Sequence, residues 1–375
     1  MKRIKLLSLL LAICILLPTL AACGKSIEEP QPETTKENEP ADLITYELSV
    51  SNSVLHTDIQ KKYLDGKYDN VLDEMDGSAE RSYPKAVVLS WISHVPDVNQ
   101  ILSEFVVLSK DASFSDPIRI KSARNRVEIY NLEIFNTYYW YVEGHLGDQV
   151  SKSEVSSFTL SDPAPRNLRV SGVTNCRDLG GWSTVSGGRT VQGKVFRSGR
   201  LAGIDGAGRK TLLKDLGIKT EIDLRLESAL QKNETKGKSM LGNDVNYVFL
   251  PMEWDVSNIL TASANEESLL KVFEIFGDEA NYPILFHCSI GTDRTGMIAF
   301  LISGLCGVSE EDLYRDYMFS GFGTINKTPN ISKLTGYLNT VKKCSGKTLA
   351  EKIENYLLSR GVTAEQIATI RKQLT

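Results

Sequence analysis

The residues best suited to chemistry are a thiol and a guanidinium separated by five residues, Cys288 and Arg294. An apolar run over 282–286 predicts a buried strand before them, and another over 297–305 predicts a buried helix after them. A loop between a strand and a helix presents successive backbone N–H groups at the positive end of the helix dipole. Such a loop binds a tetrahedral oxyanion, so we expect a phosphate group to lie against it.

Each residue of this loop is a candidate for contact with the bound anion: Ser289, Ile290, Gly291, Thr292, Asp293, Arg294 and Thr295. Gly291 allows close approach of the backbone, because it has no side chain. The planar fork of Arg294 can bind two oxygens of one phosphate.

The same positive potential acts on the thiol of Cys288. A thiol near a helix N-terminus and cationic groups can have its pKa lowered to roughly 3.5–7.5. Cys288 would then be a thiolate near neutral pH, and a thiolate is a nucleophile. We expect the Thr295 hydroxyl to hydrogen-bond the sulfur as it leaves, and we interpret His287 as a residue that orders the loop rather than as a base.

This stretch resembles the signature of the cysteine-dependent phosphatases, in which His-Cys is followed by five residues, Arg, and then Ser or Thr. The resemblance implies a phosphocysteine intermediate and neither a metal nor another cofactor. Rhodanese-like sulfurtransferases carry a shorter cysteine loop, and five intervening residues fit phosphate better than sulfane sulfur. The structural alternative is a buried cysteine beside an unrelated arginine.

Hydrolysis of a phosphate ester also needs a carboxylic acid that protonates the leaving oxygen. Asp255 follows a strand pattern over 245–250 and precedes Cys288 by 33 positions. Phosphatases of the resembled superfamily carry a mobile acid loop at about that distance, although their Trp-Pro-Asp triplet is absent here. Asp293, inside the cysteine loop, is the competing candidate, and Glu253 is a weaker one.

Three further segments extend the resemblance over about residues 168–374. They read Asn-Cys-Arg-Asp-Leu-Gly-Gly from 175, Arg-Ser-Gly-Arg-Leu from 197 and Asp-Leu-Arg from 223. Together with the loop they resemble one bacterial group of tyrosine and lipid phosphatases. The resemblance, and a helix pattern over 212–217 before a strand pattern over 218–224, predict an α/β domain over 163–375 with a central, mostly parallel sheet flanked by helices.

A charged pair and a cysteine in these segments have further interpretations, one structural and one regulatory. Asp223 and Arg225 read as a structural ion pair within an apolar segment. Cys176 stands where the entry motif of that group more often has Phe, and we consider a disulfide with Cys288 under oxidation.

The chain is long enough for two domains and a leader, with 375 residues, 41% of them hydrophobic, and a net charge of −4. No basic excess indicates nucleic acid as a partner. Six cysteines without paired spacing favour neither a disulfide scaffold nor a zinc site.

The first 42 residues read as targeting and tether segments. Residues 1–23 combine a basic start, an apolar stretch and Leu-Ala-Ala-Cys, which resembles a bacterial lipobox ending at Cys23. An ordinary secretory cleavage site is the alternative. Residues 24–42 are rich in Glu and Pro and predict a disordered tether. We therefore expect a lipid-anchored protein on the extracytoplasmic face of the cell membrane.

Residues 43–162 contain short β-branched and aromatic runs separated by turns. A Trp on an early strand and a corner formed by Leu132 and Thr137-Tyr138-Tyr139 are marks of a seven-strand sandwich. The segment resembles a fibronectin type III module. A spacer or docking role is our interpretation, with a wall of the active site as the alternative.

The sequence as a whole predicts a phosphomonoesterase of the protein-tyrosine or dual-specificity class. Phosphoinositides and inositol phosphates are alternative substrates, although the loop brings no lysine for a highly charged one. A different alternative is an inactive surface lipoprotein that binds phosphorylated ligands. The sequence does not indicate an oligomeric state.

Overall fold

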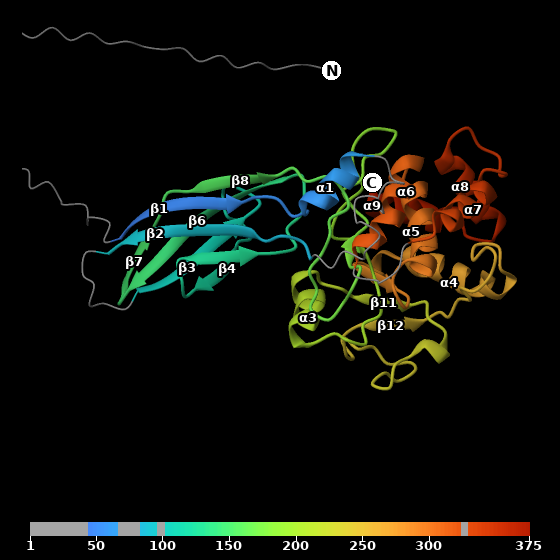
Figure 1. Ribbon diagram of the computed structural model, residues 1–375, viewed down its shortest axis with the longest axis horizontal. Coiled ribbons are helices and arrows are strands. Elements are labelled where there is room, and N and C mark those ends of the chain that lie inside the picture. The colour runs from blue at the N-terminus through green and yellow to red at the C-terminus, as the bar shows by residue number, and fades with distance from the viewer. Residues whose placement is uncertain (1–43, 67–82, 96–101, 324–328) are drawn as a thin grey trace, which may run out of the picture. The chain divides into compact units, whose positions relative to one another are not determined.

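The computed structural model describes residues 44–66, 83–95, 102–323 and 329–375 (Figure 1). The predicted signal peptide over 1–23 with its lipid-bearing Cys23, and the tether over 24–42, lie outside these residues and stay predictions. In the described part of the chain, no helix is long and apolar enough to cross a membrane. A β-rich region comes first, and a mixed α/β region follows it.

The β-rich region has two antiparallel sheets. One has the order β1-β2-β5, with the bounds Thr45–Asn52, Val87–His94 and Arg126–Ile129. The other has the order β4-β3-β6-β7, with β8 paired to β6. Its bounds are Ile118–Ser122 for β4, Leu102–Ser109 for β3, Asn136–Leu146 for β6, Gln149–Lys152 for β7 and Ser156–Leu160 for β8.

Two tryptophans lie in the core of this region. Trp91 on β2 and Trp140 on β6 are 4% and 0% exposed. The hydroxyl of Tyr138 accepts a hydrogen bond from the Glu133 N–H (2.8 Å) and donates one to the Glu133 carbonyl (3.2 Å). These contacts pin the start of β6 to the preceding turn, as in a tyrosine corner. The resemblance to a fibronectin type III module stays a prediction.

Helix α1 (Asp58–Asp65) lies in the chain between β1 and β2. Thr57 and Gln60 form a capping box at its start, in which each side chain bonds the backbone N–H of the other residue. Residues 67–82, which follow this helix, lie outside the described residues.

A five-stranded sheet of order β12-β11-β13-β10-β9 forms the centre of the mixed region. The pairings of β12 with β11, β11 with β13 and β13 with β10 are parallel, and the pairing of β10 with β9 is antiparallel. The strands are β9 (Arg177–Asp178), β10 (Val195–Ser198), β11 (Thr220–Asp223), β12 (Asn246–Phe249) and β13 (Ile284–His287). The predicted α/β class with a mostly parallel sheet is confirmed.

Both faces of this sheet are covered. Val195 and Phe286 belong to the apolar cluster that contains α5, whereas Phe196 and Leu285 belong to a second cluster. Neighbouring residues of a strand point to opposite faces, so this division follows from the pleat. The second cluster includes Leu212 of η1 (Thr211–Asp215), which continues from α3 (Gly206–Lys210).

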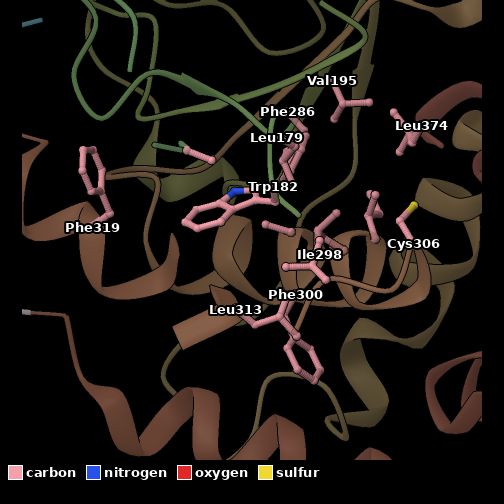
Figure 2. Packing of buried hydrophobic residues seen from close by; sticks show 14 of the residues in the cluster. Leu179, Trp182, Val195, Phe286, Ile298, Phe300, Cys306, Leu313, Phe319 and Leu374 are labelled. Carbon is pink, nitrogen blue, oxygen red and sulfur yellow. The ribbon is translucent and has the colours of Figure 1, made fainter. Parts of the chain in front are cut away.

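Helix α5 is the centre of the helical layer. Every residue from Arg294 to Leu305 is buried, which is typical of a helix in the core of a domain. Figure 2 shows Ile298 and Phe300 of α5 packed among side chains from the strands and the other helices. The helices of this layer are α4 (Glu266–Phe276), α5 (Asp293–Leu305), α6 (Glu310–Phe319), α7 (Ile331–Val341), α8 (Leu349–Ser359) and α9 (Ala364–Leu374).

The predicted boundaries were wrong by a few residues at the centre of the domain. Helix α5 begins at Asp293, four residues before the apolar run, because its first turn carries polar residues of the loop. Strand β13 begins at Ile284, after Pro283, which has no N–H to donate to a neighbouring strand.

Candidate active site

Residues 288–292 connect β13 to α5 and place Cys288 at the carboxyl end of a central strand. Gly291 has a φ of 75°, and a Cβ added there would lie 2.6 Å from the carbonyl oxygen of Ser198. Both its backbone conformation and its contact with β10 therefore require glycine.

Three consecutive loop carbonyls accept hydrogen bonds from outside the loop: Ser289 O from Arg200 N (3.2 Å), Ile290 O from Asn175 Nδ2 (2.9 Å) and Gly291 O from Arg197 Nη2 (2.8 Å). A trans peptide is planar, so its N–H points away from its carbonyl. The N–H groups of residues 290–292 therefore turn towards the inside of the loop. This arrangement can bind a tetrahedral anion.

Cys288 is only 2% exposed. Burial alone would raise the pKa of its thiol, but the Arg294 guanidinium, the Thr295 hydroxyl and the N–H groups of Thr295 and Gly291 together hold that pKa below its ordinary value. The residues that lower the pKa are those that the sequence predicts around the sulfur. The thiolate is therefore favoured at this position.

The Arg294 guanidinium is buried next to the loop without a carboxylate partner among the described residues. Its Nη1 donates to the carbonyls of Leu224 (3.1 Å) and Met252 (3.3 Å), and its Nη2 donates to the Ser289 hydroxyl (3.2 Å). Without a carboxylate partner, the charge of this buried cation can act on the Cys288 thiolate and on an anionic ligand.

Two other arginines hold the loop rather than face it. Arg197 binds the carboxylate of Asp316 (2.5 Å) as well as Gly291 O, and Arg177 binds the second oxygen of that carboxylate (2.8 Å). Arg177 also donates to the side chain of Asn175 (2.5 Å), which in turn holds the Ile290 carbonyl. Burial and the charge of Arg177 lower the pKa of Arg197 to about 10, so the Arg197 guanidinium remains protonated near neutral pH.

His287 contacts two carboxylates below the loop. Its Nε2 lies 3.0 Å from Glu221, and its Nδ1 lies 3.8 Å from Asp223. Burial would lower the pKa of His287, but Asp223 and Glu221 raise it above its ordinary value. Both ring nitrogens thus face carboxylates of β11. This position agrees with our interpretation of His287 as a residue that orders the loop rather than as a base.

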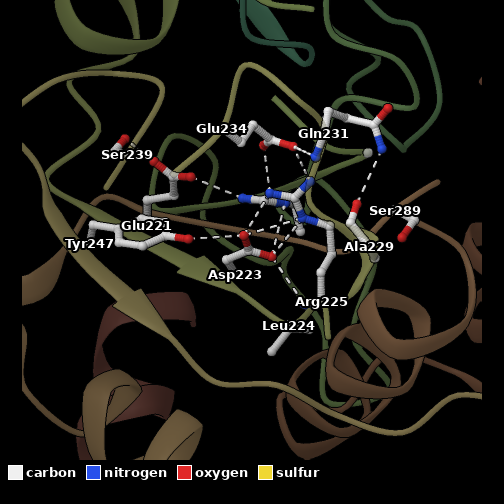
Figure 3. Close-up of polar contacts among 12 residues, drawn as sticks. Glu221, Asp223, Leu224, Arg225, Ala229, Gln231, Glu234, Ser239, Tyr247 and Ser289 are labelled. Carbon is white, nitrogen blue, oxygen red and sulfur yellow. Dashed lines mark hydrogen bonds and ion pairs between the residues drawn. The ribbon is translucent and has the colours of Figure 1, made fainter. Parts of the chain in front are cut away.

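Arg225 is paired twice, as Figure 3 shows. Its guanidinium donates to Asp223 (2.7 Å) and Glu234 (2.7 Å), and Tyr247 donates to Asp223 as well (3.0 Å). The structural interpretation of Asp223 and Arg225 is consistent with this cluster. Because two carboxylates surround it, Arg225 offers little free charge to a phosphate.

The two candidate acids have different surroundings. Asp255 is exposed and makes no hydrogen bond or ion pair with another described residue. Asp293 lies in the first turn of α5, where it accepts from the Tyr317 hydroxyl (2.9 Å) and pairs with Lys333 (3.3 Å). Asp255 is thus free to move towards a substrate, and Asp293 is held.

The loop that carries Asp255 approaches the same region. Met252, earlier in this loop, accepts from Arg294, and the Nζ of Lys333 lies 5.9 Å from the centre of the exposed Trp254 ring. Lys333 therefore contacts both Trp254, next to Asp255, and Asp293. This basic residue on α7 lies at the margin of the cysteine loop, which itself carries no lysine.

Cys176 and Cys288 are both free cysteines in the structure. Cys176 packs in the second apolar cluster with Val170 and Phe196, whereas Cys288 belongs to the first. Burial raises the pKa of Cys176 to about 12, which disfavours its thiolate. The disulfide between the two under oxidation stays a prediction.

Sequence reasoning did not identify Asp316, Tyr317, Lys333 and Glu234. All four lie outside the loop and reach it or its supports from other elements. Asp316 alone had a signal, because it is an acidic residue on the apolar face of α6, between Leu313 and Tyr317.

Comparison with known proteins gives a match to the tyrosine phosphatase family over residues 168–375. A protein of Cupriavidus necator named as a tyrosine-protein phosphatase is 29% identical over 40% of this chain and 60% of its own length. This chain thus spans less than two thirds of that relative. The triple specificity protein phosphatase PtpB of Mycobacterium tuberculosis is 23% identical over 54% of this chain and 87% of that protein.

This chain is also similar to solved structures. The catalytic core of the PP-IP phosphatase SIW14 of S. cerevisiae is 22% identical and covers 38% of this chain and 78% of its own, with a TM-score of 0.29. TpbA of P. aeruginosa is 20% identical and covers 44% of this chain and 88% of its own, with a TM-score of 0.29.

The lowered pKa of Cys288 predicts how its alkylation depends on pH. Iodoacetamide reacts with the thiolate, so we expect the rate at Cys288 in the folded protein to reach half its plateau below pH ~8.5, the ordinary value for a thiol. Mass spectrometry of the Cys288 peptide measures the rate. Unfolding in urea should move the midpoint up to about 8.5, and Arg294→Ala should raise it in the folded protein. An identical midpoint before and after unfolding would contradict the lowered pKa.

Proposed function

Because this chain belongs to the tyrosine phosphatase family, we propose that it is a cysteine-dependent phosphomonoesterase of the protein-tyrosine or dual-specificity class. The observation that carries the proposal is the position of Cys288. Its thiol has a lowered pKa and lies within a loop whose N–H groups turn inward, beside the unpaired charge of Arg294. A nucleophile and a site for a tetrahedral anion thus coincide.

In the first step, the Cys288 thiolate attacks phosphorus, a sulfur–phosphorus bond forms and the ester P–O bond breaks. The N–H groups of residues 290–292 and the Arg294 guanidinium stabilise the charge on the three equatorial oxygens. The leaving oxygen takes a proton from a carboxylic acid. Asp255 supplies this proton in our proposal, because it is exposed and unpaired on a loop that is anchored next to Arg294 through Met252.

In the second step, water attacks the phosphocysteine. The Asp255 carboxylate accepts the proton of the water, the sulfur–phosphorus bond breaks, and orthophosphate leaves while Cys288 returns to its thiolate. The Thr295 hydroxyl stabilises this leaving sulfur, as it does the resting thiolate. Asp293 keeps Tyr317 and Lys333 in place beside the loop in our proposal.

The charge around the loop favours a substrate with one phosphate ester, such as phosphotyrosine. The loop contains no lysine, and the charge of Lys333 at its margin is balanced by Asp293. Phosphoinositides and inositol phosphates remain the second substrate class.

Loss of Cys288 tests the reaction. We expect the wild-type protein to release phosphate from p-nitrophenyl phosphate under reducing conditions in the presence of EDTA, and Cys288→Ser to abolish release, because a serine hydroxyl is not ionised at this pH. Cys344→Ser, at a partly exposed free cysteine, is the matched control and should retain activity. Absence of release by the wild type from this ester, phosphotyrosyl peptides, phosphoinositides and phytate would leave a phosphate-binding protein without activity and would overturn the proposal.

The general acid is tested by two asparagine variants. A general acid must be protonated, so kcat/KM falls as pH rises through its pKa. We expect Asp255→Asn to lower kcat/KM about 10²- to 10⁴-fold and to remove this fall at higher pH. Asp293→Asn should reduce activity less and keep the fall. The reverse pattern would assign the acid to Asp293.

The cellular location is proposed from the sequence alone. We propose a lipid on Cys23 that anchors the protein at the extracytoplasmic face of the cell membrane. In a bacterial host, we expect the full chain to sediment with membranes and Cys23→Ser to move it into the soluble fraction. Cys14→Ser, in the same leader, should leave it with the membranes. Sedimentation of Cys23→Ser with the membranes would contradict the anchor.

A further inference from the structure

Residues 55–66, which we call the α1 segment, are fastened to the chain that enters the mixed region. The N–H groups of Leu55 and His56 donate to one carboxylate oxygen of Asp162 (3.0 and 3.1 Å). The Nε2 of His56 lies 2.9 Å from the carbonyl oxygen of Pro165. These groups are buried, so the start of the segment is anchored in the interior.

The α1 segment packs on the end of α6 and on η5 (Ser320–Phe322). The Tyr63 ring lies 5.4 Å from the ring of Phe322, and the His56 ring lies 5.8 Å from that of Phe319. The Tyr63 hydroxyl donates to the Arg315 carbonyl (3.1 Å), and the Arg315 side chain donates to the Gly66 carbonyl (3.1 Å). Tyr63 is 1% exposed, so this contact is closely packed.

The same stretch of α6 and η5 holds the supports of the cysteine loop. Asp316 binds Arg177 and Arg197, and Ser320 accepts from Arg177 (3.2 Å). The carbonyl of Gly323, just after η5, accepts from the N–H of Asn175 (2.9 Å). A short series of contacts therefore leads from Tyr63 to the Ile290 and Gly291 carbonyls.

The α1 segment is not part of the region that matches the phosphatase family, which begins at residue 168. We propose that it is nevertheless a positioning element of the cysteine loop, with Tyr63 as its central residue. It covers Phe319 and Phe322, and thereby fixes the segment from which Asp316 and Ser320 reach the arginines. The β-rich region would then serve the active site through the helix between its first two strands, in addition to any spacer role. This inference rests on the proposed function only for its kinetic measurement.

Truncation of Tyr63 tests the inference. Misplacement of a catalytic group by about 1 Å can cost about 10²-fold in rate. We therefore expect Tyr63→Ala to lower kcat/KM for p-nitrophenyl phosphate at least ~10-fold, mainly in kcat. The alkylation midpoint of Cys288 should also move to higher pH, since the N–H groups no longer converge on the sulfur. Tyr63→Phe, which keeps the ring, should retain most of the wild-type kcat/KM and an alkylation midpoint close to that of the wild type.

Ile59→Ala is the matched control on the same helix, because Ile59 is 40% exposed. It should behave as the wild type in both measurements. Circular dichroism melting shows whether each variant is folded at the assay temperature, and Tyr63→Leu, which keeps an apolar side chain, replaces the alanine variant if that one is not. A folded Tyr63→Ala or Tyr63→Leu with wild-type kcat/KM and midpoint would overturn the inference. If the wild type releases no phosphate, the proposed function fails, and the alkylation midpoints still test the α1 segment.

Discussion

One buried carboxylate, Asp316, is shared by the guanidiniums of Arg177 and Arg197, and the cysteine loop depends on this pairing. Loss of one partner from a buried ion pair costs about 3–5 kcal/mol, because it leaves an uncompensated charge. Here the carboxylate fixes two cations at once. Through Arg197 and Asn175 they turn two loop carbonyls outward, so the corresponding N–H groups point inward. The inward orientation of these N–H groups is thus set by residues outside the loop.

The number of carboxylates around each arginine separates structural from ligand-binding charges. Arg225 has two carboxylate partners, and Arg177 and Arg197 share one. Arg294 has none among the described residues and donates to carbonyls and a hydroxyl instead. An additional carboxylate beside Arg294 would neutralise its charge and raise the pKa of Cys288. The arginines around the site are therefore neutralised by carboxylates, whereas Arg294 within it has no carboxylate partner among the described residues.

Local features of the fold and site could be predicted from the sequence. The apolar runs around the loop identified β13 and α5, and the spacing of Cys288 and Arg294 identified the anion-binding loop. Supports from distant elements could not be predicted, because Asp316 and Lys333 reach the loop only through the packing of α6 and α7 against α5. Spacing also could not decide between Asp255 and Asp293. The surroundings of the two differ in a hydrogen bond from Tyr317 to Asp293 and an ion pair between Asp293 and Lys333, which the order of residues does not specify.

The complete burial of α5 also limits how this scaffold could diversify. Each added or deleted residue in a helix rotates the remainder of that helix by about 100°, and no face of α5 from Arg294 onward is free to accept such a turn. Insertions and deletions in α5 would therefore disrupt the core before they could reshape the geometry around phosphorus. New preferences among leaving groups would have to arise at the rim, where Trp254 and Asp255 are exposed and a substitution disturbs little packing.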